Sequence, residues 1–519
     1  MDALKLNGND LSLENFREVV TERRPVRLEP AARLRVERTR TLVDELVASG
    51  GVAYAITTGV GKLADVRIPP DQVRQLQTNL VRSHAVGVGA PLSEAATRGM
   101  MLLRANSLAK GHSGVRPLVI DTLCALLNCG VHPVIPSQGS VGASGDLAPL
   151  AHLAETLIGE GEAIWEGESL PAAEALQHAG IAPLELQAKE AISLINGTQA
   201  MLSVGSLAWL AAATLVDSAD AIAALSLDAL KGTVVAFDER IQQVRPHAGQ
   251  IQTAANLRRM LAGEDPIRES HKTCGRVQDA YSLRCIPQVH GAVRDTLAHC
   301  RHVFETEMNS AVDNPLVFLA PEVAGCPQSP GAPALAGEIL SGGNFHGEPL
   351  AFALDFLAIA LAALAGISER RTERFVNPAL SEGLPAFLAP GAGLNSGFMM
   401  VQVTAAALVS ENKVLAHPAS VDSITTSGNK EDYVSMGMTA ANKLTKVVSN
   451  TRHVLAIEAL AAAQALDFLF PLTTSPRGQR VHAAVRSASP PLEQDRSLAP
   501  DIARVADLIA SGAIAAVLQ

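Results

Sequence analysis

Apolar residues recur at spacings of three and four from about residue 188 to the C-terminus, which is the period of an α-helix. Small residues, above all alanine, occupy several faces of these stretches, which is typical of helices that pack on all sides in the middle of a bundle. The pattern predicts long helices over 199–231, 285–310, 346–376, 397–415 and 436–468.

The N-terminal part of the chain has a different pattern, in which short apolar runs alternate with Gly and Pro. A helix is expected over 115–127, followed by a turn-rich loop, and Val52–Ile56 is a short strand or loop segment. A Pro/Gly-rich insert at 320–336 is expected to be a surface loop, and a last helix is expected over 499–518. The predicted fold is mainly α, with a loop-rich N-terminal domain (1–200) and a central helical bundle with C-terminal helices (201–519).

Composition excludes several classes of protein. The chain has 519 residues, of which 48% are hydrophobic and 18% charged, so it can bury a large core. Lys and Arg number 42 against 52 Asp and Glu, and this balance argues against a nucleic-acid-binding protein. The six cysteines include no CxxC pair, which indicates reduced thiols, with neither a disulfide framework nor a metal site.

The most apolar stretch, Leu350–Ile367, is better explained as a buried core helix than as a membrane segment, because it is short and contains Asp355. The N-terminal residues lack the charged-then-apolar pattern of a signal peptide. These observations predict a cytoplasmic protein that does not bind membranes.

The segment Gly139–Leu150 carries the most informative chemistry. It is not a nucleophile elbow, and no dinucleotide-binding or P-loop motif occurs in the chain. If the loop bends tightly, the amide nitrogen of Gly145 can reach the carbonyl carbon of Ala143, because glycine has no Cβ to block the approach. Loss of water then closes a five-membered ring, and dehydration of Ser144 leaves a methylidene electrophile made without an external cofactor. The alternative for the bare tripeptide is an ordinary Gly/Ser loop.

The wider sequence decides between these two interpretations. Gly139–Leu150 resembles the signature of the histidine/phenylalanine ammonia-lyase family, whose members form a 4-methylidene-imidazol-5-one (MIO) group at this tripeptide. The resemblance covers about residues 10 to 515 and implies a mainly α, fumarase/aspartase-like superfold. It recurs in Tyr54–Gly59, Asn196–Thr198, Gln278–Arg284, Asp313–Pro315, Gly343–Gly347 and Asn395–Met399.

The resemblance implies roles for single residues. Tyr54 matches the family's catalytic tyrosine, a base whose anion needs stabilisation by helix ends or cations. Arg284 matches the arginine that binds the substrate carboxylate. A guanidinium is suited to this role because it binds a carboxylate bidentately. The alternatives are a buried tyrosine with a satisfied hydroxyl group and a structural ion pair.

Four further residues match positions around the electrophile and the substrate. Asn196 and Tyr281 would orient the amine or polarise the ring oxygen. Asn314 would support the carboxylate side, and Phe345 would pack near the ring, although a plain core phenylalanine would look the same in sequence.

Two places bear on the substrate side chain. Ser83-His84 resembles the Ser-His pair of histidine-specific members, and Glu431 matches their glutamate, where the phenylalanine and tyrosine enzymes have other residues. A carboxylate and an imidazole can both hydrogen-bond a substrate imidazole. The pair therefore points to L-histidine as substrate and urocanate as product. The alternatives are a solvated carboxylate and a structural histidine.

Several departures from the family pattern leave the substrate open. They lie in or near the expected pocket, and a lysine beside Glu431 could neutralise it or bind an acidic group. The rival hypothesis is therefore an MIO-dependent lyase or 2,3-aminomutase that acts on another amino acid. The departures are Thr57, Val60, Ile286, Lys430 and Tyr433.

Two other classes fit less well. A fumarase/aspartase-type lyase would carry a Gly-Ser-Ser-x-Met-Pro loop, which is absent. A helical scaffold without catalytic function would not need Tyr54, Ser144, Arg284 and Glu431 together. The resemblance also implies a homotetramer whose active sites draw on three subunits. Tyr54, Ala143–Gly145 and Tyr281–Arg284 are then expected to meet across subunits.

Overall fold

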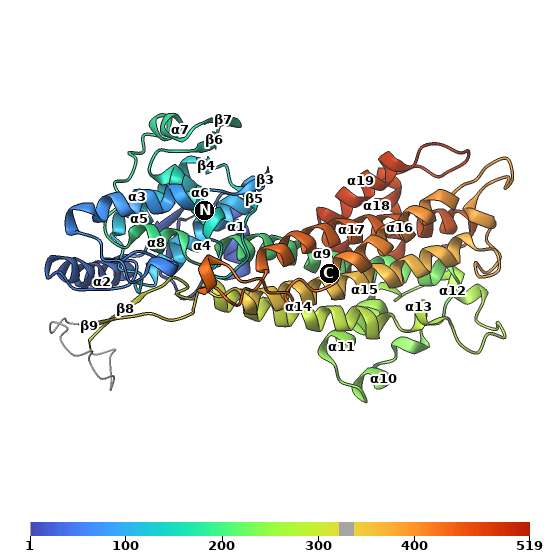
Figure 1. Cartoon of the computed structure of the whole chain (residues 1–519). Helices are drawn as coiled ribbons and strands as arrows, with labels where there is room; N and C mark the ends of the chain where they lie inside the picture. Colours follow the sequence, from blue (N-terminus) through green and yellow to red (C-terminus); the bar gives the residue numbers. More distant parts are fainter. Residues whose placement is uncertain (1, 321–336) are drawn as a thin grey trace. The chain divides into compact units, whose positions relative to one another are not determined.

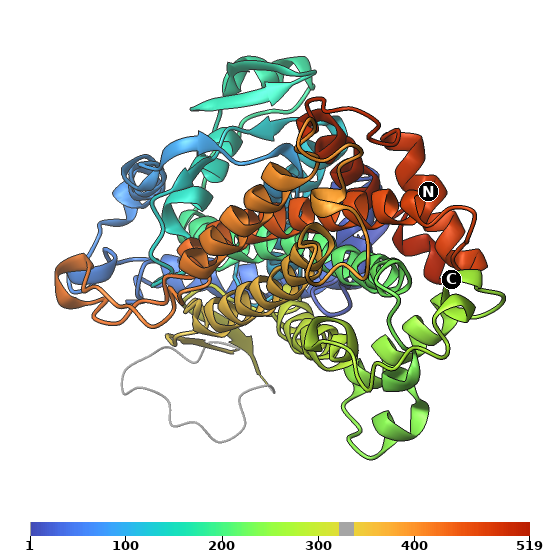
Figure 2. The same ribbon diagram turned by 90° about the vertical axis from the view of Figure 1, so that its right-hand side faces the viewer.

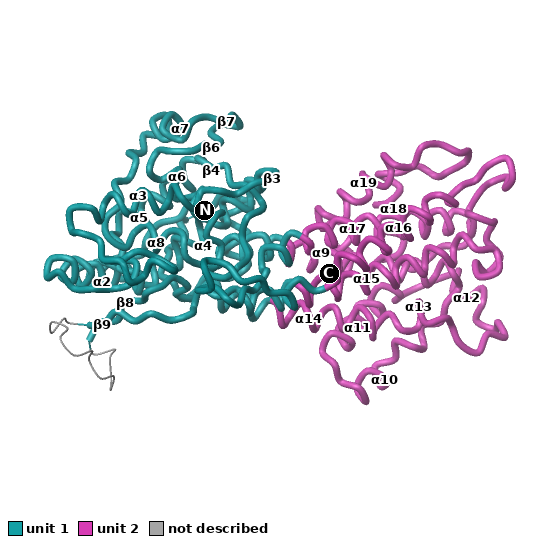
Figure 3. Tube along the Cα trace, in the orientation of Figure 1, with its two compact units in different colours: residues 1–207, 301–354, 418–442 teal, residues 208–300, 355–417, 443–519 magenta. Residues whose placement is uncertain are grey.

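The computed structural model describes residues 2–320 and 337–519, so the insert expected at 320–336 lies, apart from its first residue, outside the described residues. The chain folds into two compact units (Figure 3). Unit 1 comprises residues 1–207, 301–354 and 418–442, and unit 2 comprises residues 208–300, 355–417 and 443–519. Each unit therefore combines segments that are far apart in the sequence.

Unit 1 is organised around α4 (Glu94–Ala109), which is buried along nearly its whole length and packs against α1 and α5 (Figure 1). Ser93 caps its start, because the side-chain oxygen accepts a hydrogen bond from the Ala96 amide. The helical elements of unit 1 also include α1 (Leu13–Val20), α2 (Pro30–Ala48), α3 (Val73–His84), α5 (Pro117–Cys129), α6 (Leu147–Leu157), α7 (Ala172–His178) and α8 (Glu190–Ile195).

The strands of unit 1 are short and form sheets of two or three strands. β1 (Leu4–Leu6) pairs in parallel with β2 (Val26–Leu28), and the other pairings are antiparallel. These are β3 (Val88–Pro91) with β5 (Pro136–Gln138), β6 (Glu162–Trp165) with both β4 (His132–Pro133) and β7 (Glu168–Pro171), and β8 (Leu316–Leu319) with β9 (Gly337–Leu340).

Unit 2 is a helical bundle with a buried polar contact at its centre. The carboxylate of Glu458 accepts hydrogen bonds from Ser226 at 2.7 Å and Ser368 at 2.6 Å, and it pairs with Arg371. These bonds join α9 (Gln199–Ala229), α15 (Glu348–Val376) and α17 (Gly437–Phe468), which Figure 2 shows in green, yellow and orange. The helices of unit 2 also include α10 (Glu239–Gln243), α11 (Ala248–Met260), α12 (Pro266–Ser270), α13 (Tyr281–Arg284), α14 (Ile286–Met308), α16 (Met399–Leu415), α18 (Pro476–Ala488) and α19 (Ala499–Ala510).

The prediction of a mainly α fold is confirmed, and all five predicted long helices are present to within a few residues at each end. Val52–Ile56 contains turns and no strand. The last predicted helix is shorter than expected, because α19 ends at Ala510 and a 3₁₀ turn, Ala515–Leu518, follows it.

Two helices, α9 and α15, are long and apolar enough to cross a membrane by length and composition. In their most apolar windows, 72% of α9 and 56% of α15 is buried inside the structure. Protein neighbours therefore already cover most of this apolar surface, which is typical of core helices in a bundle.

A buried pair of carboxyl groups in unit 2 leads to a first prediction. Asp228 accepts a hydrogen bond from Thr474 at 2.6 Å, and burial together with the nearby Asp265 raises the pKa of Asp228 to about 8. The folded state then binds a proton that the unfolded state releases near pH 4. The free energy of unfolding should therefore fall as the pH rises from about 4 to about 8.

We expect Asp228→Asn to remove this fall in the free energy of unfolding at high pH. At pH 9 the variant should unfold with a free energy higher than that of the unchanged protein by about 5 kcal/mol, since each of the four pKa units corresponds to about 1.4 kcal/mol, with little difference at pH 4. Denaturant titration at both pH values measures the effect. Asp507→Asn, the same change at an exposed position of α19, is the control. A difference between Asp228→Asn and the unchanged protein that does not depend on pH would contradict the prediction.

Candidate active site

A cavity of about 970 Å³ lies in unit 1, and its lining brings together segments from distant parts of the chain. They are the loop 54–64, His84 at the end of α3, the loop before α6, the end of α8, Asn314 and the segments 341–346 and 427–433. Eight of the predicted site residues line it. These eight are Tyr54, His84, Ala143, Ser144, Asn196, Asn314, Phe345 and Glu431.

The tripeptide loop is tightly bent. Gly142 and Gly145 have φ values of 69° and 70°, a region that favours glycine. A Cβ added to Gly145 would lie 2.1 Å from the carbonyl oxygen of Gly197, so no other residue fits there without movement. Ala143 is buried, whereas Ser144 is partly exposed to the cavity. The loop therefore presents Ser144 while it encloses its two neighbours.

Bonds from distant segments hold this loop. Gly142 O accepts hydrogen bonds from the Ser435 hydroxyl at 3.0 Å and from the Gly347 amide at 3.2 Å. After the tripeptide, the buried Asp146 accepts from Ser140 Oγ at 2.7 Å and from the Met201 amide at 2.8 Å. Burial raises the pKa of Asp146 to about 6. The bend is thus imposed by the surrounding fold as well as by glycine.

Two side chains form hydrogen bonds with Ser144. Its hydroxyl donates to Glu431 Oε1 at 2.8 Å, and the second oxygen of Glu431 accepts from Thr426 Oγ1 at 2.7 Å. Asn196 Nδ2 donates to the carbonyl oxygen of Ser144 at 2.9 Å. Asn196 Oδ1 is buried and has no hydrogen-bond partner within 2–320 and 337–519.

The residues present fit an MIO group. Ring closure would place the carbonyl oxygen of Ser144 on the ring, and Asn196 already donates to this oxygen. Gly145 lacks the Cβ that would block the approach of its nitrogen. The unpartnered Oδ1 of Asn196 leaves one acceptor for a ligand.

Tyr54 lies in a turn that leads into the cavity. Its hydroxyl oxygen accepts a hydrogen bond from the Gly61 amide at 3.0 Å. Thr57 fixes the turn, because its hydroxyl donates to Gly51 O at 2.9 Å and accepts from the Ala53 amide at 3.0 Å. The turn therefore places the tyrosine oxygen beside a backbone amide donor at the cavity.

His84 and Ser83 have different surroundings. His84 lines the cavity, and its Nδ1 lies 2.8 Å from Leu80 O. Since a carbonyl can only accept, Nδ1 carries a proton, and in the neutral form of the ring Nε2 is then the acceptor. Ser83 is exposed, donates to Leu80 O at 3.1 Å and is not among the lining residues. Ser83 therefore contacts the histidine ring, at 3.0 Å from Nδ1, and not the cavity.

Asn314 is held by the segment that also carries Phe345. Its amide nitrogen donates to Ser341 Oγ at 3.0 Å, and its oxygen accepts from the Gly342 amide at 2.7 Å. Both side chains line the cavity. Asn314 thus ties the segment before α15 to the cavity wall.

Tyr281 and Arg284 belong to unit 2, where they form the short helix α13. The guanidinium carbon of Arg284 lies 4.5 Å from the centre of the Tyr281 ring, and Tyr281 is 70% exposed. Neither residue is among those that line the cavity of unit 1.

The cavity also contains polar side chains to which the sequence analysis gave no role. His346 Nε2 lies 3.2 Å from Tyr433 O, and the two rings stack with their centres 6.0 Å apart. Lys62 and Asp432 also line the cavity, as do Lys430 and Tyr433, two of the departures that were expected in or near the pocket. The sequence could have indicated His346 and Asp432, because they directly follow the predicted residues Phe345 and Glu431. Lys62 had no such signal.

Known proteins resemble this chain in sequence and in fold. The sequence profile of the aromatic amino acid lyase family matches residues 11–487. A histidine ammonia-lyase from Koribacter versatilis (strain Ellin345) is 70% identical over 516 residues, which are 99% of each chain. Among solved structures, a tyrosine aminomutase from Streptomyces globisporus is 40% identical with a TM-score of 0.91, over 99% of this chain and 98% of that one. A histidine ammonia-lyase from Trypanosoma cruzi is 42% identical with a TM-score of 0.89, over 99% and 95% of the two chains. The chain therefore belongs to the aromatic amino acid lyase family.

Proposed function

We propose that this protein is a soluble, cytoplasmic enzyme that eliminates ammonia from L-histidine to give trans-urocanate. The observation that carries the proposal is that Glu431 and His84 line the same cavity as Ser144. A carboxylate and a neutral imidazole can both hydrogen-bond a substrate imidazole, and both would match a phenyl ring poorly. The name of the Koribacter versatilis relative supports the same substrate.

The electrophile is proposed to form from the chain itself. The nitrogen of Gly145 bonds to the carbonyl carbon of Ala143, and the carbonyl oxygen leaves as water with two protons from the reacting groups. Ser144 loses its Cα proton and its hydroxyl group as a second water, and the electron pair of the C–H bond becomes the Cα–Cβ double bond. When present, the MIO group supplies an electrophile for the substrate amine, and no external cofactor is needed.

The side chains of unit 1 are proposed to do the rest of the chemistry. Tyr54 takes the β-proton of the substrate, with the Gly61 amide donating to its oxygen. The electrons of that C–H bond form the new double bond, and the Cα–N bond breaks to release ammonia. Asn196 polarises the carbonyl oxygen of Ser144, and Phe345 packs against the reacting group.

The carboxylate of the substrate needs a partner as well. We propose that Arg284 binds it and Tyr281 orients the amine, both from another subunit of a homotetramer, and that Asn314 supports the carboxylate side. Ser83 is proposed to act on the substrate through its contact with the His84 ring.

The test is an absorbance assay for urocanate with purified protein and L-histidine, beside L-phenylalanine and L-tyrosine. We expect a rising signal with L-histidine alone and release of ammonia in equal amount. If ammonia or a β-amino acid were formed only from another amino acid, the proposal of L-histidine as the substrate would be wrong. The rival lyase or aminomutase would then apply, and the tyrosine aminomutase likeness gives that rival a structural precedent.

The substitution Glu431→Gln tests whether this residue binds the imidazole of the substrate. Loss of the carboxylate replaces a charge-assisted hydrogen bond to the substrate imidazole by a neutral one, which should lower kcat/KM for L-histidine by about tenfold to a hundredfold. Steady-state kinetics measure the change, and Glu185→Gln, the same substitution at an exposed position outside the cavity lining, is the control, which should keep the kcat/KM of the unchanged protein. If kcat/KM of Glu431→Gln stayed at the level of the unchanged protein, Glu431 would not bind the substrate.

A further inference from the structure

Asn196 and Gly197 hold the tripeptide and the residue that follows it. Asn196 Nδ2 donates to Ser144 O at 2.9 Å, and Gly197 O accepts from the Asp146 amide at 2.7 Å. A short backbone bridge also pairs Gly145 with Gly197. Any shift of residues 196 and 197 would therefore move the bend in which Gly145 approaches Ala143.

A buried cation holds this peptide in turn. Arg104 of α4 is fully buried, and its Nη1 donates to Asn196 O at 2.7 Å and to Ser193 O at 2.9 Å. A Cβ added to Gly197 would lie 2.8 Å from Arg104 Nη2, so the guanidinium packs directly against residue 197. Burial lowers the pKa of Arg104 to about 10, which still leaves the side chain charged at neutral pH.

Burial of a guanidinium group costs free energy unless its bonds compensate. The hydrogen bonds of Arg104 go to two backbone carbonyls and, at 3.4 Å, to Ser107 Oγ, and its Nε has no partner among the described residues. The carboxylate of Asp313 acts on it through charge alone. Stability by itself therefore does not explain why a charge stands at this position.

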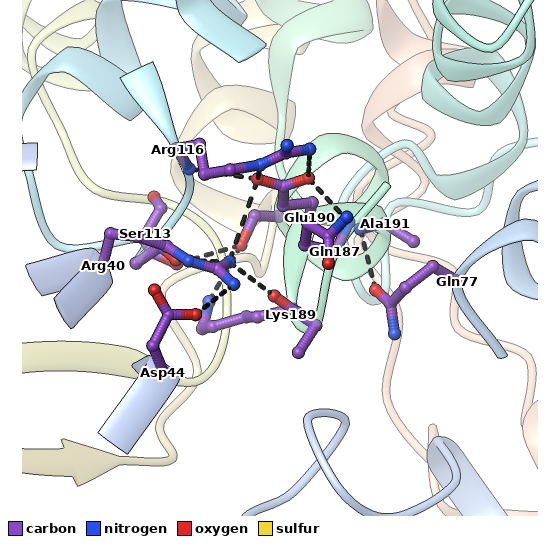
Figure 4. A network of polar contacts seen from close by, with 12 residues as sticks. Arg40, Asp44, Gln77, Ser113, Arg116, Gln187, Lys189, Glu190 and Ala191 are labelled. Carbon is purple, nitrogen blue, oxygen red and sulfur yellow. Dashed lines mark hydrogen bonds and ion pairs between the residues drawn. The ribbon is translucent and has the colours of Figure 1, made fainter. Parts of the chain in front are cut away.

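The start of α8 is fixed independently. Figure 4 shows Arg116 paired with Glu190, whose buried carboxylate accepts from Arg116 Nε and Nη2 at 2.8 Å each. The buried Lys189 donates to Asp313 at 3.0 Å and to Ser193 Oγ at 2.9 Å. These bonds hold the first turn of α8, so Arg104 is the side chain that fixes the far end, at Asn196.

We propose that Arg104 is a positioning residue for the electrophile. It fixes Asn196 and Gly197, which hold Ala143–Gly145 in the bend needed for ring closure and keep Asn196 on the carbonyl oxygen of Ser144. The inference rests on the proposed function, because it presumes that the tripeptide cyclises. It also assigns a role to a residue that does not touch the cavity.

The experiment compares Arg104→Met and Arg104→Lys with Arg98→Met in the full chain. Arg98 is the matched control, because it lies on the same helix, is 2% exposed and donates to the carbonyls of Val19 and Leu127, away from the tripeptide. Intact mass measures the fraction of protein lighter by two waters, and kinetics with L-histidine measure kcat and KM. Circular dichroism identifies the folded material.

We expect folded Arg104→Met to show a smaller fraction lighter by two waters and a kcat lower by about a hundredfold, with a smaller change in KM. Arg104→Lys should give values of this fraction and of kcat between those of Arg104→Met and the unchanged protein, because an ammonium keeps the charge but not the planar fork. If Arg104→Met does not fold, Arg104→Lys alone is compared with the unchanged protein. Folded Arg98→Met should keep the mass and kcat of the unchanged protein.

Two results would overturn the inference. One is a folded Arg104 variant with full loss of two waters and unchanged kcat. The other is an equal deficit in Arg98→Met, which would make the effect a general one of the core. If the unchanged protein itself lacked the loss of two waters, the proposed function would fail, and the Arg104 comparison would fail with it.

Discussion

Ser144→Ala is expected to lower kcat for ammonia release from L-histidine by at least about a thousandfold, which corresponds to roughly 4 kcal/mol of transition-state stabilisation. Without the hydroxyl group, residue 144 cannot lose water, so no methylidene forms and the amine stays a poor leaving group. The backbone contacts of the loop do not involve Ser144 Oγ, so the fold should persist.

The control for Ser144→Ala must separate loss of the electrophile from loss of a bond to Glu431. Ser144 donates to one oxygen of this carboxylate and Thr426 to the other. Thr426→Val therefore removes a comparable hydrogen bond and leaves the tripeptide intact. We expect it to stay within about tenfold of the unchanged kcat, as the loss of one hydrogen bond implies. Equal losses in the two variants would mean that Ser144 acts only through Glu431.

Gly145→Ala should have an effect of similar size for a steric reason. The new Cβ would meet Gly197 O at 2.1 Å, a contact that real structures do not contain, and the φ of 70° is unfavourable for alanine. The loop must then leave its bend, and Gly145 N can no longer approach Ala143. We expect a protein whose intact mass shows no loss of two waters and whose kcat is lower by about a thousandfold or more.

Gly180→Ala separates the clash from the backbone strain. Gly180 has a φ of 68°, but an added Cβ there would meet nothing within 4 Å. The strain alone costs on the order of 1 kcal/mol of stability, so this variant should lose some stability and keep its mass and kcat. If Gly145→Ala still lost two waters, approach of the Gly145 nitrogen would not depend on this space.

The contacts of Ser144 could not be predicted from the sequence. The resemblance suggested Glu431 as a substrate ligand, but its hydrogen bond to Ser144 joins residues 287 positions apart. Ser83 and His84 looked equivalent as a pair, yet only His84 lines the cavity, because adjacent positions at the end of α3 point in different directions. Lys62 had no sequence signal at all, since a lysine in a loop is usually solvated.

The long helices could be predicted without a structure, because a helix repeats its apolar face every three or four residues. The bare tripeptide allows an ordinary Gly/Ser loop as well as a ring, and only the resemblance over the wider sequence led to the prediction of an electrophile at Ala143, Ser144 and Gly145. Only the folded chain shows that residues 301–354 and 418–442 return to unit 1, and that Arg104 donates a hydrogen bond to the carbonyl oxygen of Asn196. Such contacts follow from how helices pack, and an arginine in a helix has the same local pattern whether it faces water or a buried carbonyl.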